Sequence, residues 1–596
     1  MLGRSKDKDF VSIGNCSGFY GDRKSAMLEM LTGGDLDVIT GDYLAELTML
    51  ILARQKQEDP DSGYAKTFLQ QLEECLEIAI RDEVKIVVNA GGMNPRGLAG
   101  AIEKLAKTRG IDCSTAFIEG DDVTDRAESL GLGNPLAANA YLGGFGISEA
   151  LKHGADVVVT GRVTDASLIV GAAAWFHGWS REDYDEIAGA MAAGHVIECG
   201  TQATGGNFSF FKEIENPIHP GFPIARIHPD GSSVITKHPG TNGAVTRETV
   251  LAQLLYEVQG LRYGGPDAVL RLDSLKVEEL GKDQVLISGA KGELPPTDLK
   301  VSVNEIGGYR NEVEFLLTGL DIEEKAALLQ ESFDFEMAEQ PEEVEWTLVR
   351  NDRPNAEVEE EATAILRLVG RDKDPHKVGR SFSGAAVELL FVVPGLHLSS
   401  PPQHGRVYGR FTPAYIPQDE VEHIVHLSNG ESIVAPPPLE TEAFTDNSLH
   451  DQHADVKEAA RTEDLVPRLS VPFGRIFGTR SGDKGGNANI GVWARNEEGY
   501  KWLRENLTVD LLCKLLPELA DFEVGRIDLP NLGALNFVVT GILGEGVAYG
   551  ARFDPQAKGI GEWLRARRIT VPTSLIKAAK PRLVGIETEQ PKEVRL

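Results

Sequence analysis

The stretch ADVVVTGRVTDAS, residues 155–167, contains the pattern that decides the fold: an apolar, β-branched run ends in glycine and polar residues, and a helical pattern follows. The same pattern recurs at 11–23, 38–49 and 87–95. Strands that are apolar on both faces and alternate with helices are typical of a parallel sheet covered by helices. Residues 1–260 are therefore predicted to form an α/β core around a parallel sheet.

A different pattern begins after residue 260. Short strands and glycine turns predict an additional α+β region at 261–438, in which Ala385–Val393 is expected to be a strand. The acidic run 439–467 has little apolar periodicity, which predicts an exposed linker. Strands interleaved with helices at 468–580 predict a compact α+β domain, and 581–596 is expected to be a tail.

Length and composition restrict the class of protein. A chain of 596 residues is expected to hold about two to four domains, because one hydrophobic core does not grow to that size. The 41% hydrophobic and 25% charged residues exclude a disordered chain, and no apolar run is long enough to predict a membrane span. The start MLGRSKDKDF has no apolar segment, and the five cysteines form no CxxC pair. We therefore expect a cytoplasmic protein.

The net charge of −31 comes from 91 acidic and 60 basic residues and argues against nucleic acid and anionic membranes as partners. Most of the excess lies in two segments, 320–362 and 418–464, while the chain from residue 468 onward is mildly basic. Because the acidic segments lie outside the glycine-rich loops, the net negative charge does not exclude a small anionic metabolite or an acyl-CoA as the substrate.

Polar side chains follow the expected strands, at the sheet edge where ligands of α/β proteins bind. Asn15 and Asp22 follow the first strand, and Asn89 follows the third. Asp42 and Glu46 lie four residues apart, so a helix that starts at Asp42 would carry two carboxylates on one face. The alternatives are a helix N-cap at Asp42 and a simple turn at Asn89.

Two further loops carry stronger chemical signals. Arg162 is a natural clamp for a carboxylate or phosphate, and Asp165 can orient it or act as a base; the alternative is a structural ion pair. In HVIECGTQATGGN, residues 195–207, Glu198 is a candidate acid or base in a glycine-rich turn after an expected strand. Cys199 is a candidate nucleophile near His195, or a small buried apolar residue. Gln202 and Thr204 are candidate substrate-binding residues in the same turn.

Cations occur in two more loops. Lys237 lies in a Gly/Pro loop before a helix and is either an anion clamp or part of a solvated turn. The segment 478–489 is expected to be a glycine loop between strands, and it contains Arg480, Asp483 and Lys484. A structural role for that loop is the alternative.

No motif predicts a metal site or a bound nucleotide. The chain has no HExxH, no zinc-type spacing, no EF-hand loop, no Walker-type phosphate loop and no GxSxG elbow. The histidines and aspartates at 450–455 fall in the expected linker and are interpreted as solvated. The cofactor is unknown, and carboxylates from separate loops remain compatible with Mg²⁺.

The segments VSIGNCSGFYGDR, VITGDYLAELTM, VVNAGGMNP, ADVVVTGRVTDAS, HVIECGTQATGGN and TRSGDKGGNANIGVW resemble the signatures of the AtuA family of acyclic terpene utilisation proteins. Residues 1–450 are similar to the AtuA core, and 468–580 to an AtuA-like domain with a ferredoxin fold. The resemblance implies a role in catabolism of acyclic terpenes such as citronellol and geraniol, close to acyl-CoA steps. It supplies no agreed roles for single residues.

From the loops and the resemblance together we expect an enzyme of branched acyclic carboxylic acid or acyl-CoA catabolism. General acid–base chemistry would make it a hydratase, a dehydratase or a C–C lyase, with Asp165 or Glu198 as the base and Arg162 and Lys237 as anion clamps. The alternatives are a Cys199-dependent hydrolase or amidase and a non-catalytic, partner-binding subunit. We also expect a homo-oligomer. The catalytic candidates are Asp42, Glu46, Asp165, Glu198 and Cys199.

Overall fold

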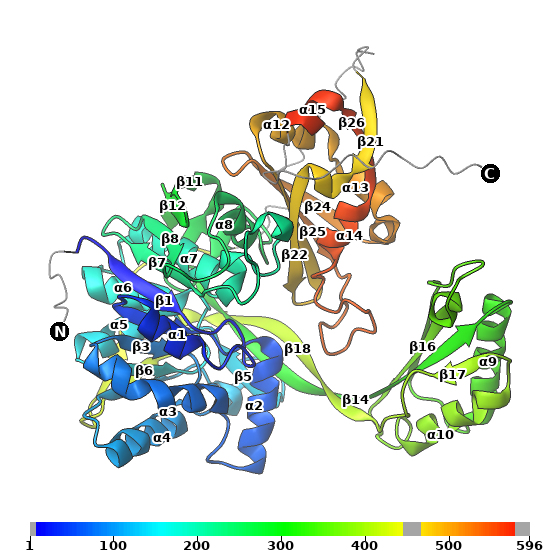
Figure 1. The fold of residues 1–596 in the computed structure, drawn as a ribbon. Coiled ribbons are helices and arrows are strands. Elements are labelled where there is room, and N and C mark those ends of the chain that lie inside the picture. Colours follow the sequence, from blue (N-terminus) through cyan, green and yellow to red (C-terminus); the bar gives the residue numbers. More distant parts are fainter. Residues whose placement is uncertain (1–7, 445–466, 579–596) are drawn as a thin grey trace. The chain divides into compact units, whose positions relative to one another are not determined.

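The computed structural model describes residues 8–444 and 467–578 (Figure 1). They fall into two compact units. Of the described residues, unit 1 holds 8–303, 412–444, 467–544 and 556–578, and unit 2 holds Asn304–Phe411 and Glu545–Pro555. The predicted tail at 581–596, the histidines and aspartates at 450–455 and most of the predicted linker lie outside the described residues.

An 11-stranded sheet forms the centre of unit 1. Its middle strands, in the order β1-β2-β3-β6-β4, all pair in parallel, and the strands on either side of them are antiparallel. The α/β fold class with a parallel sheet is thus confirmed. The parallel strands are β1 (Val11–Asn15), β2 (Val38–Gly41), β3 (Lys85–Val88), β4 (Thr115–Glu119) and β6 (Val157–Thr160). The antiparallel strands are β7 (Pro223–Ile227), β8 (Ser233–Lys237), β11 (Lys276–Gly281), β12 (Gln284–Ser288), β19 (His423–His426) and β20 (Ser432–Ala435).

Helices bury both faces of the parallel strands, as the apolar runs require. Successive residues of β3 and β6 enter two different cores: Val87 and Val158 pack into one, and Ile86 and Val159 into the other. The first core holds α5 (Phe145–Lys152), α6 (Ser167–His177), α7 (Tyr184–Ile197) and α8 (Arg247–Leu254). The second holds α1 (Ala26–Gly33), α3 (Lys66–Arg81) and α4 (Pro95–Arg109), while α2 (Glu46–Glu58) belongs to a small separate cluster.

Unit 1 also contains smaller sheets. A 4-stranded antiparallel sheet in the order β22-β23-β25-β24 packs with α12, α13 and α14 around its own core. This sheet and its helices have the α+β class expected for this part of the chain, while residues Glu545–Pro555 belong to unit 2. Its elements are β22 (Phe477–Lys484), β23 (Asn487–Ala494), α12 (Glu497–Asn506), α13 (Val509–Leu515), β24 (Glu523–Leu529), β25 (Ala534–Thr540) and α14 (Ile560–Ala566). The remaining elements are β5 (Ala137–Ala140), β9 (Arg262–Gly264), β10 (Val269–Arg271), β13 (Gly292–Glu293), β21 (Arg468–Pro472), β26 (Arg568–Pro572) and α15 (Thr573–Ala578).

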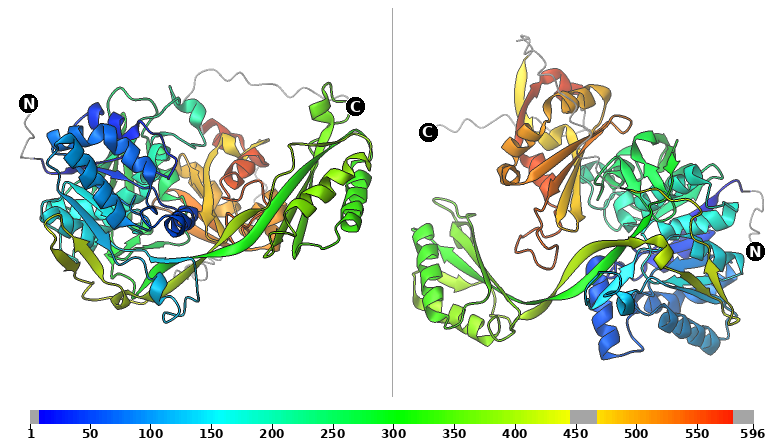
Figure 2. Two further views of the ribbon diagram at one scale, coloured as in Figure 1. Left: turned by 90° about the horizontal axis from the view of Figure 1, so that it is seen from below. Right: turned by 180° about the vertical axis from the view of Figure 1, so that it is seen from behind.

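Unit 2 is built on a second antiparallel sheet. The long strand β14 (Asp298–Thr318) begins in unit 1, continues into unit 2 and pairs there with β16 (Thr363–Asp372). The sheet is completed by β15 (Glu343–Val349), β17 (Leu396–Leu398) and β18 (Arg406–Pro417), and the helices α9 (Ile322–Glu336) and α10 (Arg380–Glu388) pack on it (Figure 2). The predicted division at residue 260 differs from this one, because β11, β12, β19 and β20 extend the first sheet.

The strand predicted at Ala385–Val393 is wrong. The segment continues α10 and then forms a short 3₁₀ turn, Leu389–Phe391. Its buried residues Phe382, Ala385, Ala386 and Leu389 are spaced three and four apart, which is the period of a helix face and not of a strand.

Candidate functional site

The carboxyl ends of the parallel strands bring four predicted residues to one edge of the sheet. Asn15 ends β1, Asp42 follows β2, Asn89 follows β3, and Arg162 follows β6. All four are buried, with exposed fractions of 6% or less. The carboxyl ends of parallel strands lie at the same edge of a sheet, so the sequence pattern was sufficient to predict that these four residues lie near one another.

Asp42 is held by Asn89 and not by a helix. Asn89 Nδ2 donates to Asp42 Oδ1 at 2.5 Å, while Asn89 Oδ1 accepts from the backbone N–H of Tyr43 at 2.8 Å. Helix α2 begins only at Glu46 with Ala45 as its N-cap, so Asp42 is neither the start of the helix nor its N-cap. Burial and then the negative charge of Asp165 raise the pKa of Asp42 well above its usual value. Asp42 is therefore a carboxyl group that tends to keep its proton.

Arg162 places a fixed positive charge beside this carboxyl group. Its Nη1 donates to Asp165 Oδ1 at 2.9 Å and to the carbonyl of Leu44 at 3.2 Å. The guanidinium lies 4.2 Å from the centre of the Tyr141 ring, and Nε is buried without a hydrogen-bond partner among the described residues. Burial opposes the charge, but Asp165, Tyr141 and nearby carboxylates outweigh it and raise the pKa of Arg162.

Glu46 forms the ionised side of the site. Tyr141 donates to its Oε1 over 3.4 Å, and Lys300 Nζ lies 3.9 Å from the same oxygen. Burial works against ionisation, but the positive charges of Lys300, Arg162 and Lys484 outweigh it and lower the pKa of Glu46 to about 2. The pKa values of two acidic groups in the cluster are thus shifted in opposite directions: the pKa of Glu46 is lowered and that of Asp42 is raised.

His195 and Glu198 form a buried pair at the end of α7. His195 Nδ1 lies 3.1 Å from Glu198 Oε1, and the exposed fractions are 3% and 6%. Burial, Asp165 and Glu257 raise the pKa of Glu198 well above its usual value. Burial and then Lys484 lower the pKa of His195 to about 4. These shifts favour the protonated form of Glu198 and the neutral form of His195. The strand predicted before Glu198 is wrong, because α7 continues to Ile197.

The C-terminal domain contributes a β-hairpin to this cluster. The segment 478–489 was expected to be a loop, but β22 and β23 pair along it and turn at Gly485 and Gly486. Arg480 donates to Gln202 Oε1 and, over 3.2 Å, to the carbonyl of Asn207, and its guanidinium lies 4.2 Å from the Tyr256 ring centre. The hairpin therefore binds the segment that follows Glu198.

Lys484 is the cation at the tip of the hairpin. Its Nζ lies 3.7 Å from Glu257 Oε2. Burial opposes its charge, but Glu257, Tyr263, Glu46 and Asp165 outweigh it and raise the pKa of Lys484. The neighbouring Asp483 has its pKa raised to about 7 by burial and then by Glu257 and Glu46.

Close packing fixes the position of Glu257. A Cβ at Gly482 would lie 2.3 Å from an atom of the Tyr256 ring, so only glycine allows the hairpin to approach this closely. Asn489 accepts from the backbone N–H of Glu257 at 2.9 Å and donates to the carbonyl of Leu255 at 2.7 Å. Glu257 itself has φ 57°, a left-handed conformation that few residues with a Cβ adopt. The residues that do adopt it are concentrated at functional sites.

Cys199 lies in the cluster but lacks the features of a nucleophile. Burial and then the charges of Glu198 and Glu257 raise the pKa of its thiol well above the usual value. The nearest histidine in sequence, His195, uses its Nδ1 toward Glu198. A reactive thiol needs an environment that lowers its pKa, so the surroundings of Cys199, although it is partly exposed, favour an inert thiol.

Other predicted residues serve as supports or lie elsewhere. Asn15 donates to the carbonyls of Ile197 and Glu198 at 2.6 and 2.9 Å and so anchors the end of α7. Asp22 accepts from the backbone of Gly18, and Thr204 donates to the carbonyl of Gly221. Lys237 pairs with Asp283 at 3.3 Å and donates to the carbonyl of Thr241 at 2.7 Å, and no interaction links it to the cluster among the described residues.

Sequence reasoning left several members of the cluster out of the candidate set. Tyr141 follows β5, a strand end that could have been searched in the same way as the others. Lys300 lies at the start of β14 and Glu257 after α8, and neither position carries a local signal. Tyr263, whose ring centre lies 4.8 Å from that of His195, has its pKa raised by burial and by Glu198.

Within residues 8–444 and 467–578, no group of three or more His, Cys, Asp or Glu side chains is arranged to hold a metal ion. In the same ranges no helix is both long and apolar enough to cross a membrane.

Comparison with known proteins gives two matches. A family model described as acyclic terpene utilisation family protein AtuA matches residues 11–427, and a model of the AtuA ferredoxin-like domain matches residues 471–570. The resemblance stated from the loop sequences is confirmed over both parts, and with it the ferredoxin-like class of the C-terminal domain. No curated protein and no solved structure matches the chain.

Proposed function

The chain belongs to the AtuA family of acyclic terpene utilisation proteins, and on that premise we propose that it is an enzyme of branched acyclic acid or acyl-CoA catabolism. The reaction is a proton transfer next to a carbonyl group, as in hydration, dehydration or C–C cleavage. The site is the buried cluster at the carboxyl edge of the parallel strands, completed by the β22–β23 hairpin.

The observation that carries the proposal is the His195–Glu198 pair. Glu198 Oε2 and His195 Nε2 are both buried and have no hydrogen-bond partner among the described residues. Buried polar atoms in native proteins are normally satisfied, so two orphans in one pair suggest that a substrate supplies the missing partner. A carboxyl group whose raised pKa favours the protonated form, beside an imidazole whose lowered pKa favours the neutral form, offers a proton donor and a proton acceptor.

Besides a proton donor and a proton acceptor, this chemistry needs groups that stabilise a developing negative charge, and the cations of the cluster fit that requirement. Lys484 pairs with Glu257 and Arg162 pairs with Asp165, and the surrounding carboxylates favour the charged form of both cations. The Arg162 side chain is buried, whereas 34% of the Lys484 side chain is exposed. Fixed cations in a site that excludes water stabilise an oxyanion more than mobile ones do. In the proposal Glu198 is the acid, Asp165 or His195 the base, and Lys484 and Arg162 bind the substrate's anionic oxygen.

Two other functions have less support. A Cys199-dependent hydrolase or amidase would require a thiol of lowered pKa, whereas burial raises it. A non-catalytic subunit would not need Glu198 and His195 to remain unsatisfied, because buried polar groups that only stabilise the fold are paired with one another.

Deuterium exchange tests the proposal without knowledge of the full reaction. The purified chain is incubated in D₂O with citronellic and geranic acids and with their CoA thioesters, and uptake of deuterium next to the carbonyl is followed by mass spectrometry. We expect uptake with at least one of these compounds. Glu198→Gln keeps the shape of the side chain but removes the acid, and should slow uptake by about 100-fold or more.

Cys199→Ser is the matched control and should leave the exchange rate unchanged. Loss of exchange in that variant, with an acyl thioester trapped on the unmodified chain, would replace the proposal with the hydrolase. Full exchange in Glu198→Gln, or no exchange with any of the four kinds of compound, would contradict it.

A further inference from the structure

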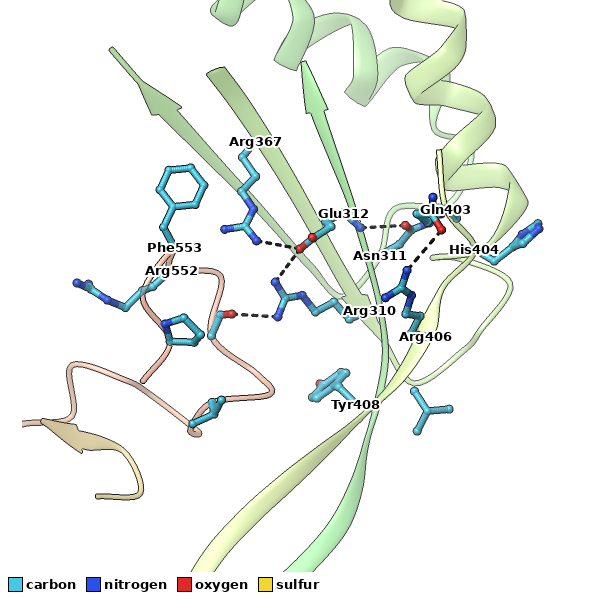
Figure 3. Close-up of a pocket in the computed structure, with 14 residues that line it drawn as sticks. Arg310, Asn311, Glu312, Arg367, Gln403, His404, Arg406, Tyr408, Arg552 and Phe553 are labelled. Atoms are coloured by element: carbon cyan, nitrogen blue, oxygen red, sulfur yellow. Dashed lines mark hydrogen bonds and ion pairs between the residues drawn. The ribbon is translucent and has the colours of Figure 1, made fainter. Parts of the chain in front are cut away.

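Unit 2 contains a pocket of about 410 Å³ that is separate from the cluster in unit 1. Its walls come from β14, β16, β18 with the segment before it, and the insertion Glu545–Pro555 (Figure 3). That volume lies within the range of small-molecule sites. The lining residues used below are Arg310, Glu312, Arg367, Arg406, Tyr408 and Arg552.

The pocket is strongly basic, although the segment 320–362 of the same unit is acidic. Four arginines line it, and Glu312 is the one acidic residue among the lining side chains. A concave surface with one sign of charge concentrates the field and attracts the opposite charge. Because several positive charges face one negative charge, the complementary ligand is a multiply charged anion.

Two of the arginines are held in place by their surroundings. Arg310 Nη1 donates to the carbonyl of Gly550 at 2.9 Å, and Arg367 Nη1 donates to the carbonyl of Ala551 at 2.6 Å. Both also donate from Nη2 to Glu312 Oε2 at 2.9 Å. Arg367 is 9% exposed, and its Nε is buried without a partner among the described residues. This wall is therefore rigid before any ligand arrives, which lowers the entropic cost of binding.

The opposite wall is more accessible. Arg406 is exposed and donates a long hydrogen bond, 3.4 Å, to Gln403 Oε1. Asn311 donates to the carbonyl of Gln403 at 3.0 Å and so fixes the segment that carries Arg406. Arg552 lies on the insertion, and the ring of Tyr408 lies at the edge of the pocket (Figure 3).

We propose that this pocket binds a small molecule that carries a diphosphate group and a flat ring, of the kind found in a nucleoside diphosphate and in the nucleotide part of coenzyme A. Guanidinium groups match phosphate oxygens in geometry, and a diphosphate supplies the multiple charge that a single carboxylate lacks. Tyr408 offers an aromatic surface for the ring. The pocket lies wholly in unit 2, so this inference does not depend on the acid–base chemistry proposed for the cluster.

Isothermal titration of the full chain tests this inference with four probes: ADP, coenzyme A, inorganic pyrophosphate and adenosine. We expect ADP or coenzyme A to bind, pyrophosphate to bind more weakly, and adenosine not to bind. Arg406→Gln and Arg552→Gln should each weaken binding by about tenfold. Arg353→Gln removes an exposed arginine of the same unit that pairs with Glu361 outside the pocket, and should leave binding unchanged.

The outcomes separate the sources of the ligand. Equal binding of ADP and coenzyme A supports recognition of the shared nucleotide diphosphate, and preference for one identifies the source. Absence of binding by all the phosphorylated probes at about 1 mM would overturn the inference. Binding that Arg406→Gln and Arg552→Gln leave unchanged would overturn it too. Thermal melts of each variant, together with Arg406→Lys, which keeps the charge and should retain most of the affinity, distinguish lost binding from lost folding.

Discussion

Two glutamates show how differently the two units use the same side chain. Glu198 in unit 1 is buried beside a neutral histidine, and burial raises its pKa. Glu312 in unit 2 is half exposed between two arginines; burial there is outweighed by Arg367 and Arg310, which lower its pKa. The difference teaches that the partner and not the residue type decides whether a carboxyl group can deliver a proton or only holds a fixed charge.

The largest expected effect concerns Lys484, because the cluster in unit 1 depends on a cation supplied by the C-terminal domain. Lys484→Met removes the charge but keeps much of the length of the side chain. Deuterium uptake should fall by about 100-fold to 1,000-fold, the range seen when one group that stabilises an oxyanion is lost. The measurement is the exchange rate with the best compound of the set.

Lys484→Arg is the control, because it keeps the positive charge with a different shape. It should retain a larger part of the rate than Lys484→Met. If Lys484→Met exchanges as fast as the unmodified chain, the hairpin serves only to pack against the core, and the contrast between the two units loses its functional meaning.

The next effect concerns packing. In Gly482→Ala the new Cβ would lie 2.3 Å from the Tyr256 ring, so the hairpin or the ring must move. We expect a loss of stability of about 1–3 kcal/mol, which thermal unfolding would detect. Gly384→Ala is the matched control in unit 2: no atom lies within 4 Å of its new Cβ, and it lies inside α10. This control should be neutral or slightly stabilising, and equal losses in both variants would contradict the packing argument.

The sequence predicted the part of the site that depends on topology. Asn15, Asp42, Asn89 and Arg162 each end an apolar run, and parallel strands bring such ends together without further information. Glu198 and Cys199 were assigned to the correct segment but to the wrong element, because Val196 and Ile197 are β-branched residues in the last turn of a helix. Local propensity there was overridden by the packing of α7 in the core.

The rest depends on contacts between distant segments, which one sequence does not encode in a local pattern. Lys300 and Glu257 reach the cluster because β14 and the β22–β23 hairpin pack against the core. The arginine pocket of unit 2 is completed by residues 545–555, more than 100 positions after β18. Arg367 and Arg371, four positions apart on β16, lie on one face of the strand, but they do not predict the insertion that this face holds.

A smaller effect concerns pH and Asp483, whose pKa in the folded chain is about 7. An unfolded aspartate has a pKa of about 3.9, so between these values the folded state holds a proton that the unfolded state has released. The stability from the protonated form is complete below about pH 4 and is lost as the pH rises toward 7. Asp483→Asn keeps a neutral side chain at every pH and should lack this loss.

Melting temperatures of the unmodified chain and of Asp483→Asn, compared from about pH 4 to pH 8, measure the stability that protonated Asp483 contributes. The difference in free energy of unfolding between the two chains should grow with pH to about 1 kcal/mol. This is well below the value expected if the pKa of a fully buried side chain rose from about 3.9 to about 7, because the Asp483 side chain is partly exposed. A difference that is constant over this range would mean that Asp483 is ionised in the folded chain. The raised carboxyl pKa values of the cluster would then be confined to Asp42 and Glu198.

The smallest expected effect concerns Glu312 and is opposite in sign to the effect of changing Glu198. Glu198→Gln should abolish most of the exchange, whereas Glu312→Gln removes the one negative charge from the arginine pocket and should tighten ADP binding by about two- to fivefold. Glu343→Gln is the control, because Glu343 also accepts from an arginine, Arg371 at 3.0 Å, but does not line the pocket. Titration calorimetry with ADP would compare the unmodified chain, Glu312→Gln and Glu343→Gln. Weaker binding in Glu312→Gln would show that Glu312 orients Arg310 and Arg367 more than it offsets their charge, and the carboxylate would then belong to the binding geometry of the pocket.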